Sequence, residues 1–368
     1  MAGFWEEKYL QDALLLGGTP DQLNGKALWE CPSNIALIKY WGKKPMQLPL
    51  NPSVSFTLKE SKTTMIVDFS TSRMHKKPHL QYFFKNQPGK IFEERIFQFL
   101  QRVLPYLPFI HHMELVIRSD STFPHSAGIA SSASSFGALA LCLCTVEKTA
   151  FGTLKDEQEF LRKASFLARL GSGSACRSVF GGFSLWGKTE TFSHSDDEVA
   201  VSINDMVHPV FHEYIDSILV IHSGIKQVSS SEGHRLMDEH PYGTARIVQA
   251  NANVKNMLTI LKNGDESGLI SLAEEEALSL HAMMMTSKPG YLLLKPASIE
   301  VIDRIRRFRA STGLPVSFTL DAGANIHVLY PARIRSEISS FIWSELEVFC
   351  DAGRIIHDQV GTGPVKLS

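Results

Sequence analysis

The chain has 368 residues, 44% of them hydrophobic, and its 37 Lys and Arg residues nearly balance its 38 Asp and Glu residues. A chain of this length and composition can bury a sizeable core, in two domains or in one large one. The formal net charge of -1 gives no overall attraction to nucleic acid or to an anionic membrane, so any anion-binding site must be local.

The cysteines and the apolar stretches indicate a cytoplasmic protein. The five cysteines are an odd number without zinc-ribbon spacing, as expected for reduced thiols in the cytosol. Residues 1–18 lack the charged-then-apolar order of a secretory signal. The longest apolar stretch, residues 137–146, is shorter than the ~20 residues that span a bilayer, so we expect no membrane-spanning part.

The first half of the chain predicts strands followed by helices. Apolar or alternating runs bounded by turn residues are typical of strands, and apolar residues spaced three or four apart are typical of helices. Strands are expected at residues 35–40, 54–58, 63–69, 80–84, 113–118 and 181–186, and helices at residues 91–104, 129–149 and 156–170.

The second half predicts an antiparallel sheet with helices on one face, which makes the fold class α+β. Strands are expected at residues 217–222, 315–320 and 325–330, and helices at residues 242–261, 267–285, 298–311 and 334–349. The predicted division is an N-terminal arm at residues 1–27, an N-terminal domain at residues 28–205 and a C-terminal domain at residues 206–368.

A run of small residues at 124–135 follows a predicted strand and opens the helix expected from residue 129. Small residues at a helix start let a phosphate approach the backbone N–H groups, where the helix dipole favours an anion. Ser131 and Ser132 could add hydroxyl contacts to a phosphate or to nucleotide-bound Mg²⁺. Close helix packing needs the same small residues, so both explanations stay open. The Gly-Lys-Ser/Thr ending of a Walker A loop is absent.

A second small-residue turn, Gly-Ser-Gly-Ser-Ala-Cys-Arg-Ser, occupies residues 171–178. Gly171 alone could be a helix cap. Two serines and Arg177 within six residues also offer hydroxyl, backbone and guanidinium donors to one carboxylate or phosphate. The turn therefore predicts an anion site.

Two charged residues lie where predicted strands end. Lys39 ends an apolar run and needs either an anion or an exposed strand edge. If the strand continued, Lys39 and Trp41 would point one way and Tyr40 the other. Asp321 follows an apolar strand and precedes a glycine turn, so it is either a turn former or a carboxylate that a sheet holds toward a cleft.

Together these four segments resemble the diphosphomevalonate decarboxylase family of the GHMP kinase superfamily. The pattern N-I-A-x-I-K-Y-W-G-K is matched at residues 34–43, and P-x-x-A-G-L-A-S-S-A at residues 124–133 except for Ile129. G-S-G-S-A-C-R-S is matched at residues 171–178 and D-A-G-x-N at residues 321–325. The resemblance covers nearly the whole chain outside the N-terminal arm.

The resemblance implies a two-domain GHMP-kinase-like fold with the active site in the cleft between the domains. The N-terminal domain would be like the second domain of ribosomal protein S5, and the C-terminal domain would be a ferredoxin-like α/β sandwich. It also implies ATP-dependent decarboxylation of (R)-5-diphosphomevalonate to isopentenyl diphosphate through phosphorylation of the 3-hydroxyl group. The partners would be small molecules, including ATP with Mg²⁺, in a homodimer without a protein-bound metal and without nucleic acid or membrane.

Position by position, the resemblance implies roles for individual residues. The implied catalytic residues are Asp321, Lys39 and Arg177, the last facing the substrate carboxylate. The implied substrate-binding residues are Tyr40, Trp41, Lys43, Ser172, Gly173, Ser174, Arg177 and Ser230. The implied ATP-binding residues are Ser126, Ala127, Gly128, Ile129, Ala130, Ser131 and Ser132.

Some positions depart from the family pattern and leave alternatives open. The loop after Lys43 is short and lacks the usual acidic residues, and Pro52 replaces a small polar residue. Ser231 stands where some bacterial members have arginine. A phosphomevalonate decarboxylase or a mevalonate 3-kinase is therefore the alternative, and a catalytically silent ATP-binding sensor is a further one. The presence of Asp321 and Lys39 argues against a silent protein, and Arg177 argues against a simple kinase.

Overall fold

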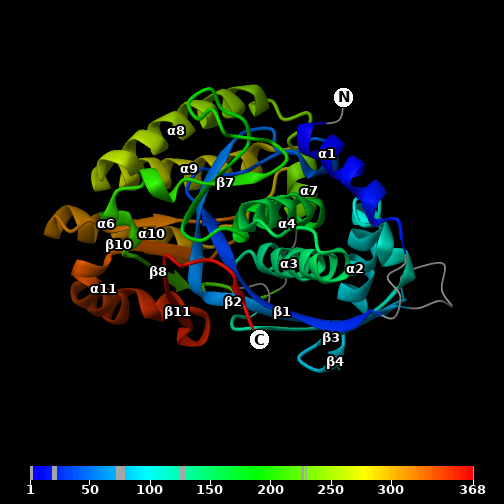
Figure 1. The fold of residues 1–368 in the computed structure, drawn as a ribbon. Coiled ribbons are helices and arrows are strands. Elements are labelled where there is room, and N and C mark those ends of the chain that lie inside the picture. The colour runs from blue at the N-terminus through cyan, green and yellow to red at the C-terminus, as the bar shows by residue number, and fades with distance from the viewer. Residues whose placement is uncertain are drawn as a thin grey trace.

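Two β-sheets with helices packed around them form the frame of the molecule (Figure 1). The computed structural model describes residues 3–18, 23–71, 79–124, 129–224, 228 and 230–367. One sheet has eight strands, with β12, β1, β2, β5, β3 and β4 in order and with β6 joined to β2 and β7. The other has four antiparallel strands in the order β11, β8, β10, β9.

The eight-stranded sheet is antiparallel except where β3 runs parallel to β5. Its strands are β1 (Asn24–Ala36), β2 (Ser53–Thr71), β3 (His79–Phe84), β4 (Gln87–Pro88), β5 (Met113–Ser121), β6 (Phe183–Trp186), β7 (Ala200–Ser202) and β12 (Val365–Lys366). The helices near it are α1 (Phe4–Ala13), α2 (Lys90–Val103), α3 (Ser131–Phe151), α4 (Glu157–Gly171) and α5 (Ala175–Ser178).

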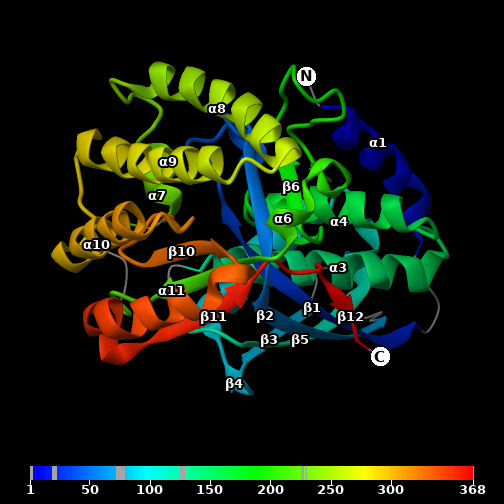
Figure 2. The ribbon, with the colours of Figure 1, turned by 90° about the vertical axis from the view of Figure 1, so that its left-hand side faces the viewer.

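The four-stranded sheet carries the longer C-terminal helices, with α8 and α9 stacked beside it in Figure 2. Its strands are β8 (Tyr214–Leu219), β9 (Ser317–Thr319), β10 (Ile326–Pro331) and β11 (Ile355–Gln359). The helices of this part are α6 (Pro209–His212), α7 (Ser230–Arg235), α8 (Gly243–Asn263), α9 (Glu266–Thr286), α10 (Pro296–Thr312) and α11 (Arg335–Phe341).

Helix α3 lies close against β1 and β2 because its sheet-facing residues are small. Ala133, Ser134 and Ala138 are fully buried. A Cβ on Gly137 would come within 2.6 Å of Cys31 Sγ, so only glycine permits this approach. This face of α3 thus places the start of the helix firmly against the sheet.

The expected two-domain α+β fold is confirmed, and three local expectations are wrong. The strands expected at 54–58 and 63–69 are one continuous strand, β2. β1 ends at Ala36, so Lys39 lies beyond the strand and the alternation argument does not apply to it. Helix α3 begins at Ser131 and not at residue 129.

The predicted division into an arm and two domains stays a prediction. Helix α1 forms within the predicted arm, and β12 returns from the C-terminal part to pair with β1. In the described part of the chain, no helix has the length and apolar character needed to cross a bilayer.

Candidate active site

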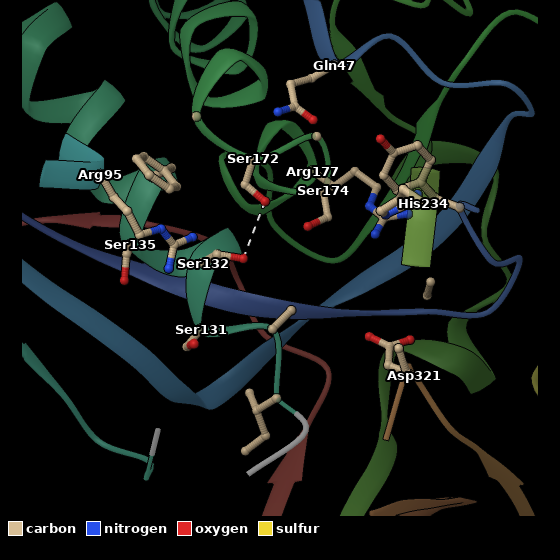
Figure 3. A pocket seen from close by; sticks show the side chains of 18 of the residues that line it. Gln47, Arg95, Ser131, Ser132, Ser135, Ser172, Ser174, Arg177, His234 and Asp321 are labelled. Carbon is tan, nitrogen blue, oxygen red and sulfur yellow. Dashed lines mark hydrogen bonds between the residues drawn. The ribbon is translucent and has the colours of Figure 1, made fainter. Parts of the chain in front are cut away.

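A cavity of about 810 Å³ lies where elements of the two sheets meet. Its walls bring together the four segments that the sequence singled out (Figure 3). Among the sequence-predicted residues, those that line it are Lys39, Tyr40, Trp41, Lys43, Ile129, Ala130, Ser131, Ser132, Ser172, Gly173, Ser174, Arg177 and Asp321. Ser126, Ala127 and Gly128 lie outside the described residues, as does the side chain of Ser230, whose backbone begins α7.

A charged contact in the cavity joins Lys39 and Asp321, which follow strands of different sheets. Lys39 Nζ lies 2.9 Å from Asp321 Oδ1 and donates a second hydrogen bond to the carbonyl oxygen of Ala36 at 2.6 Å. The Lys39 carbonyl accepts a hydrogen bond from Asn51 Nδ2 at 2.9 Å. Asp321 follows β9, and the turn after β9 aims its carboxylate into the cavity.

The environment of Asp321 keeps it ionised. Burial alone would raise the pKa of this carboxyl group, but the positive charge of Lys39 and the hydrogen bond from it, with smaller contributions from His327 and Arg177, hold the pKa below its usual value. Burial lowers the pKa of Lys39, and Asp321 offsets part of that effect. The side chain of Asp321 is 27% exposed and that of Lys39 only 1%, so the carboxylate is the member that a ligand can reach.

Arg177 lies across the cavity from Asp321, beside Ser172 and Ser174 (Figure 3). It belongs to the short helix α5 and is 3% exposed. Its Nη1 donates a hydrogen bond to Ser53 Oγ at 2.8 Å, whereas its buried Nε has no hydrogen-bond partner among the described residues. A buried guanidinium with an unused donor is suited to binding an anionic ligand.

The start of α3 forms a hydroxyl-rich end of the cavity. Ser131, Ser132 and Ser135 line it, and Ser132 Oγ lies 3.3 Å from Ser172 Oγ. The sheet-facing Ser134 instead shares a hydrogen bond of 2.7 Å with Thr63 Oγ1. The packing explanation holds for the sheet-facing side of the helix start, whereas the other side lines the cavity and its phosphate binding stays a prediction.

An aromatic cluster forms the wall near Lys39. The His234 ring lies 4.4 Å from the Tyr40 ring and 4.7 Å from the Trp41 ring, measured between centroids. Burial, with a smaller contribution from Lys43, lowers the pKa of His234 to about 3, and its Nδ1 accepts a hydrogen bond from the Gly42 N–H, so the ring is neutral. The sequence argument missed His234, which only tertiary packing brings to this wall.

The short loop after Lys43 adds a second missed residue, Gln47. Gln47 lines the cavity, and its Oε1 accepts a hydrogen bond from Lys43 Nζ at 3.0 Å. Met46 and Gln47 have φ values of 59° and 60°, a left-handed conformation that side chains rarely adopt. Arg95 of α2 also lines the cavity, and its place on an ordinary amphipathic helix offered no signal in the sequence.

The oxygen donors in the cavity suit magnesium carried by a nucleotide. Mg²⁺ usually keeps several waters and is held by one or two carboxylates together with substrate phosphates. Asp321 and the hydroxyl groups of Ser131 and Ser132 are donors of this kind. Within the described ranges, no group of three or more His, Cys, Asp or Glu side chains is placed to hold a metal ion.

Two family models match most of the chain. Residues 31–199 match the diphosphomevalonate decarboxylase-like N-terminal domain, and residues 217–358 match the mevalonate 5-diphosphate decarboxylase C-terminal domain. The diphosphomevalonate decarboxylase of Gibberella zeae is 30% identical, and the match covers 93% of this chain and 97% of that protein.

Solved structures show the same architecture. The mevalonate diphosphate decarboxylase of Staphylococcus aureus is 27% identical with a TM-score of 0.80, covering 94% of this chain and 99% of that chain. A protein named MDDEF, solved in complex with MVAPP, AMPPCP and magnesium, is 26% identical with a TM-score of 0.78, covering 94% of this chain and 100% of that chain.

Proposed function

Since this chain belongs to the diphosphomevalonate decarboxylase family, we propose that the family's reaction takes place in the cavity between the two sheets. The enzyme converts (R)-5-diphosphomevalonate to isopentenyl diphosphate and consumes ATP, which is carried with Mg²⁺. ADP, phosphate and CO₂ are the other products. The solved relative in complex with MVAPP, AMPPCP and magnesium supports these substrates.

The proposed reaction has two stages. The 3-hydroxyl oxygen bonds to the γ-phosphorus of ATP as the bond to ADP breaks, and the hydroxyl proton is lost. The C3–O bond then breaks with departure of phosphate, and the electron pair of the C1–C2 bond becomes the C2=C3 double bond as CO₂ leaves. A 3-hydroxy acid has no carbonyl group to take up these electrons, so an electron-poor C3 has to do so.

The pairing of Lys39 with Asp321 is the observation that carries our assignment of the catalytic groups. Asp321 is held as a carboxylate and is open to the cavity, so it is suited to accept the 3-hydroxyl proton. Lys39 orients that carboxylate and offsets negative charge on the transferring phosphoryl group.

We assign the remaining ligand contacts to Arg177, to the serines and to the residues near Lys39. Arg177 holds the C1 carboxylate, with Ser172, Gly173 and Ser174 beside it. Ile129 and Ala130, just before α3, and Ser131 and Ser132 at its start hold the ATP phosphates through backbone N–H groups and hydroxyls. Tyr40 and Lys43 bind near the substrate diphosphate, Trp41 also contacts the substrate, and Ser230 is assigned to substrate binding from its position in the sequence.

We also propose that the protein is cytoplasmic and forms a homodimer. All five cysteines are buried free thiols, which is typical of a reducing compartment. Burial raises the pKa of Cys176 to about 12, so its thiol stays protonated and unreactive despite its place beside Arg177. Sedimentation at several protein concentrations measures the oligomeric state.

One assay tests the proposed function against its alternatives. The protein is incubated with Mg-ATP and, separately, with mevalonate, its 5-phosphate or its 5-diphosphate, and ADP, phosphate and CO₂ are measured. We expect one of each product per turnover with the diphosphate. CO₂ from the monophosphate alone would instead identify a phosphomevalonate decarboxylase. ADP without CO₂ would identify a 3-kinase, and no ADP with any substrate would contradict catalysis.

A further inference from the structure

Helix α9 contacts the main chain of both members of the Lys39–Asp321 pair. Glu276 Oε2 accepts a hydrogen bond from the backbone N–H of Lys39 at 2.8 Å. Five residues further along the helix, His281 Nε2 donates to the carbonyl oxygen of Asp321 at 3.2 Å. Leu280, between them, lines the cavity. One helix of the second sheet's layer is thus attached to segments that come from both sheets.

The Glu276 carboxylate is rigidly held. It is fully buried, and Arg246 of α8 binds it in bidentate fashion, with Nη1–Oε1 at 2.8 Å and Nη2–Oε2 at 2.5 Å. Asn253 Nδ2 donates to Oε1 at 2.7 Å. With the Lys39 N–H, all four contacts are donors, so the carboxylate has a single orientation.

We infer that Glu276 and His281 are positioning residues that fix the distance between Lys39 and Asp321. This inference rests on the proposed function, because it concerns the same two catalytic groups. A buried ion pair is weak support for a role in stability, since desolvation of the two charges offsets their attraction. The contacts that cross from α9 to the catalytic segments give the Glu276–Arg246 pair a different role. It anchors the backbone of Lys39, while Lys39 Nζ remains free to bind Asp321.

The chain offers a matched control on the same helix. Glu274 is also buried and is bound by two arginines of α10, Arg309 Nη1 at 2.5 Å and Arg306 Nε at 3.1 Å. Its arginine partners lie within the C-terminal part, and it does not line the cavity. Glu274→Gln therefore breaks a buried ion pair of the same kind without touching the catalytic segments.

The central experiment compares steady-state kinetics of Glu276→Gln and Glu274→Gln. Because every partner of Glu276 is a donor, the NH₂ group of a glutamine must face a donor and the Lys39 segment shifts. We expect kcat to fall by about 10- to 100-fold, since small misplacements of reacting groups have effects of this size. KM for both substrates should change little. Glu274→Gln should keep the wild-type kcat and lower only the melting temperature.

His281 gives an independent test through a conservative rescue. His281→Phe removes the donor to the Asp321 carbonyl, whereas His281→Gln can place an amide nitrogen near the position of Nε2. We expect kcat to fall in His281→Phe and to recover at least partly in His281→Gln. Equal kcat values in the two variants would show that hydrogen bonding by His281 does not position Asp321.

These experiments distinguish a failure of the proposed function from a failure of the positioning inference. A wild-type protein without decarboxylase activity contradicts the proposed function. An active wild type beside a folded Glu276→Gln variant with unchanged kcat contradicts only the positioning inference. If Glu276→Gln does not fold, Arg246→Lys keeps a cation but loses the bidentate contact, and the same split of kcat from KM decides.

Discussion

Among the described residues, two pairs join a buried lysine to a carboxylate, and they differ in one instructive way. Lys39 and Asp321 meet at 2.9 Å in the cavity, and Lys163 of α4 meets Glu147 of α3 at 2.6 Å in the core. Both lysines are 1% exposed. The carboxylates differ, since Asp321 is 27% exposed and Glu147 only 2%.

The two carboxyl groups also have opposite pKa shifts. Burial raises the pKa of Glu147, and the charge of Lys163 with hydrogen bonds from Lys163 and Thr153 offsets only part of that. The pKa of Asp321 is lowered because electrostatic interactions with His327 and Arg177 add to the charge and hydrogen bond of Lys39. At Glu147, the charge of one lysine therefore leaves the pKa of the buried carboxyl group above its ordinary value. Surrounding cations and an opening to the cavity distinguish a carboxylate suited to catalysis from one suited to packing.

The largest difference between the two pairs is expected when the carboxylate charge of each is removed. Asp321→Asn keeps the shape but removes the proton acceptor, so we expect turnover to fall by at least ~10²-fold with the fold retained. Glu147→Gln should leave turnover per folded molecule unchanged and cost about 3–5 kcal/mol of stability, because it leaves Lys163 buried without its partner. Near-wild-type turnover in Asp321→Asn would contradict its catalytic role. A coupled assay of ADP release measures turnover, and thermal melting measures stability.

The second prediction concerns Arg177, the cation that distinguishes the cavity pair. Arg177→Lys keeps the charge but loses the planar fork, so orientation of the substrate carboxylate should suffer. We expect kcat/KM for diphosphomevalonate to drop about ten- to hundredfold, the effect of one charge-assisted hydrogen bond. The Kd of an ATP analogue should stay the same. Loss of nucleotide affinity with normal substrate kinetics would instead assign Arg177 to ATP.

A smaller effect is expected at the start of α3, where two neighbouring serines face opposite ways. Ser132→Ala removes a hydroxyl that lines the cavity, so ATP-analogue binding should weaken about two- to tenfold, the net value of one hydrogen bond. Ser134→Ala is the control, because its hydroxyl bonds to Thr63 in the core and should affect stability alone. Unchanged ATP kinetics in Ser132→Ala would leave Ser132 with a packing role.

The smallest predicted effect is a difference in how stability depends on pH. The folded pKa of Glu147 lies above its ordinary value of 4.5, so its contribution to stability is present below pH 4.5 and is lost as pH rises through the raised value. The folded pKa of Asp321 lies below 3.8, so its contribution is present above pH 3.8 and is lost only as pH falls through the lowered value.

Melting temperatures measured from pH 4.5 upward check this difference. The wild type should lose stability relative to Glu147→Gln as pH rises through this range. The difference in melting temperature between the wild type and Asp321→Asn should not change with pH in this range. The opposite result would contradict our assignment of the two environments. In that result, the stability difference between wild type and Glu147→Gln would not change with pH, and the difference between wild type and Asp321→Asn would.

Sequence patterns predicted most helices and part of the cavity wall, but not every strand. β1 starts at Asn24, ahead of the strand expected at residues 35–40, and continues through Pro32. The register of β1 against β2 shifts between Pro32 and Asn34, an irregularity of the kind where a sheet tolerates proline. β11 contains His357 and Asp358, which interrupt an apolar pattern but pair with β8.

The contacts that hold the catalytic groups could not be predicted. Glu276 and Lys39 are 237 positions apart, and nothing in the local pattern of either segment indicates that they meet. Glu276 lies in a run of three glutamates, a residue type that is mostly exposed, whereas in the structure Glu276 and Glu274 are buried against arginines. The packing of both α8 and α10 on α9 decides which glutamates face inward.

The late strand β12 has a consequence for synthesis on the ribosome. It pairs with β1 at Trp29 and Glu30, on the edge of β1 away from β2. The other strands of this sheet have been made once Ser202 has been added, and about 160 residues then follow before β12, which takes roughly 10 to 30 seconds at ordinary elongation rates. During that time the outer edge of β1 is open to pairing with another nascent chain, and the charged Lys26 and Glu30 on this strand discourage such pairing.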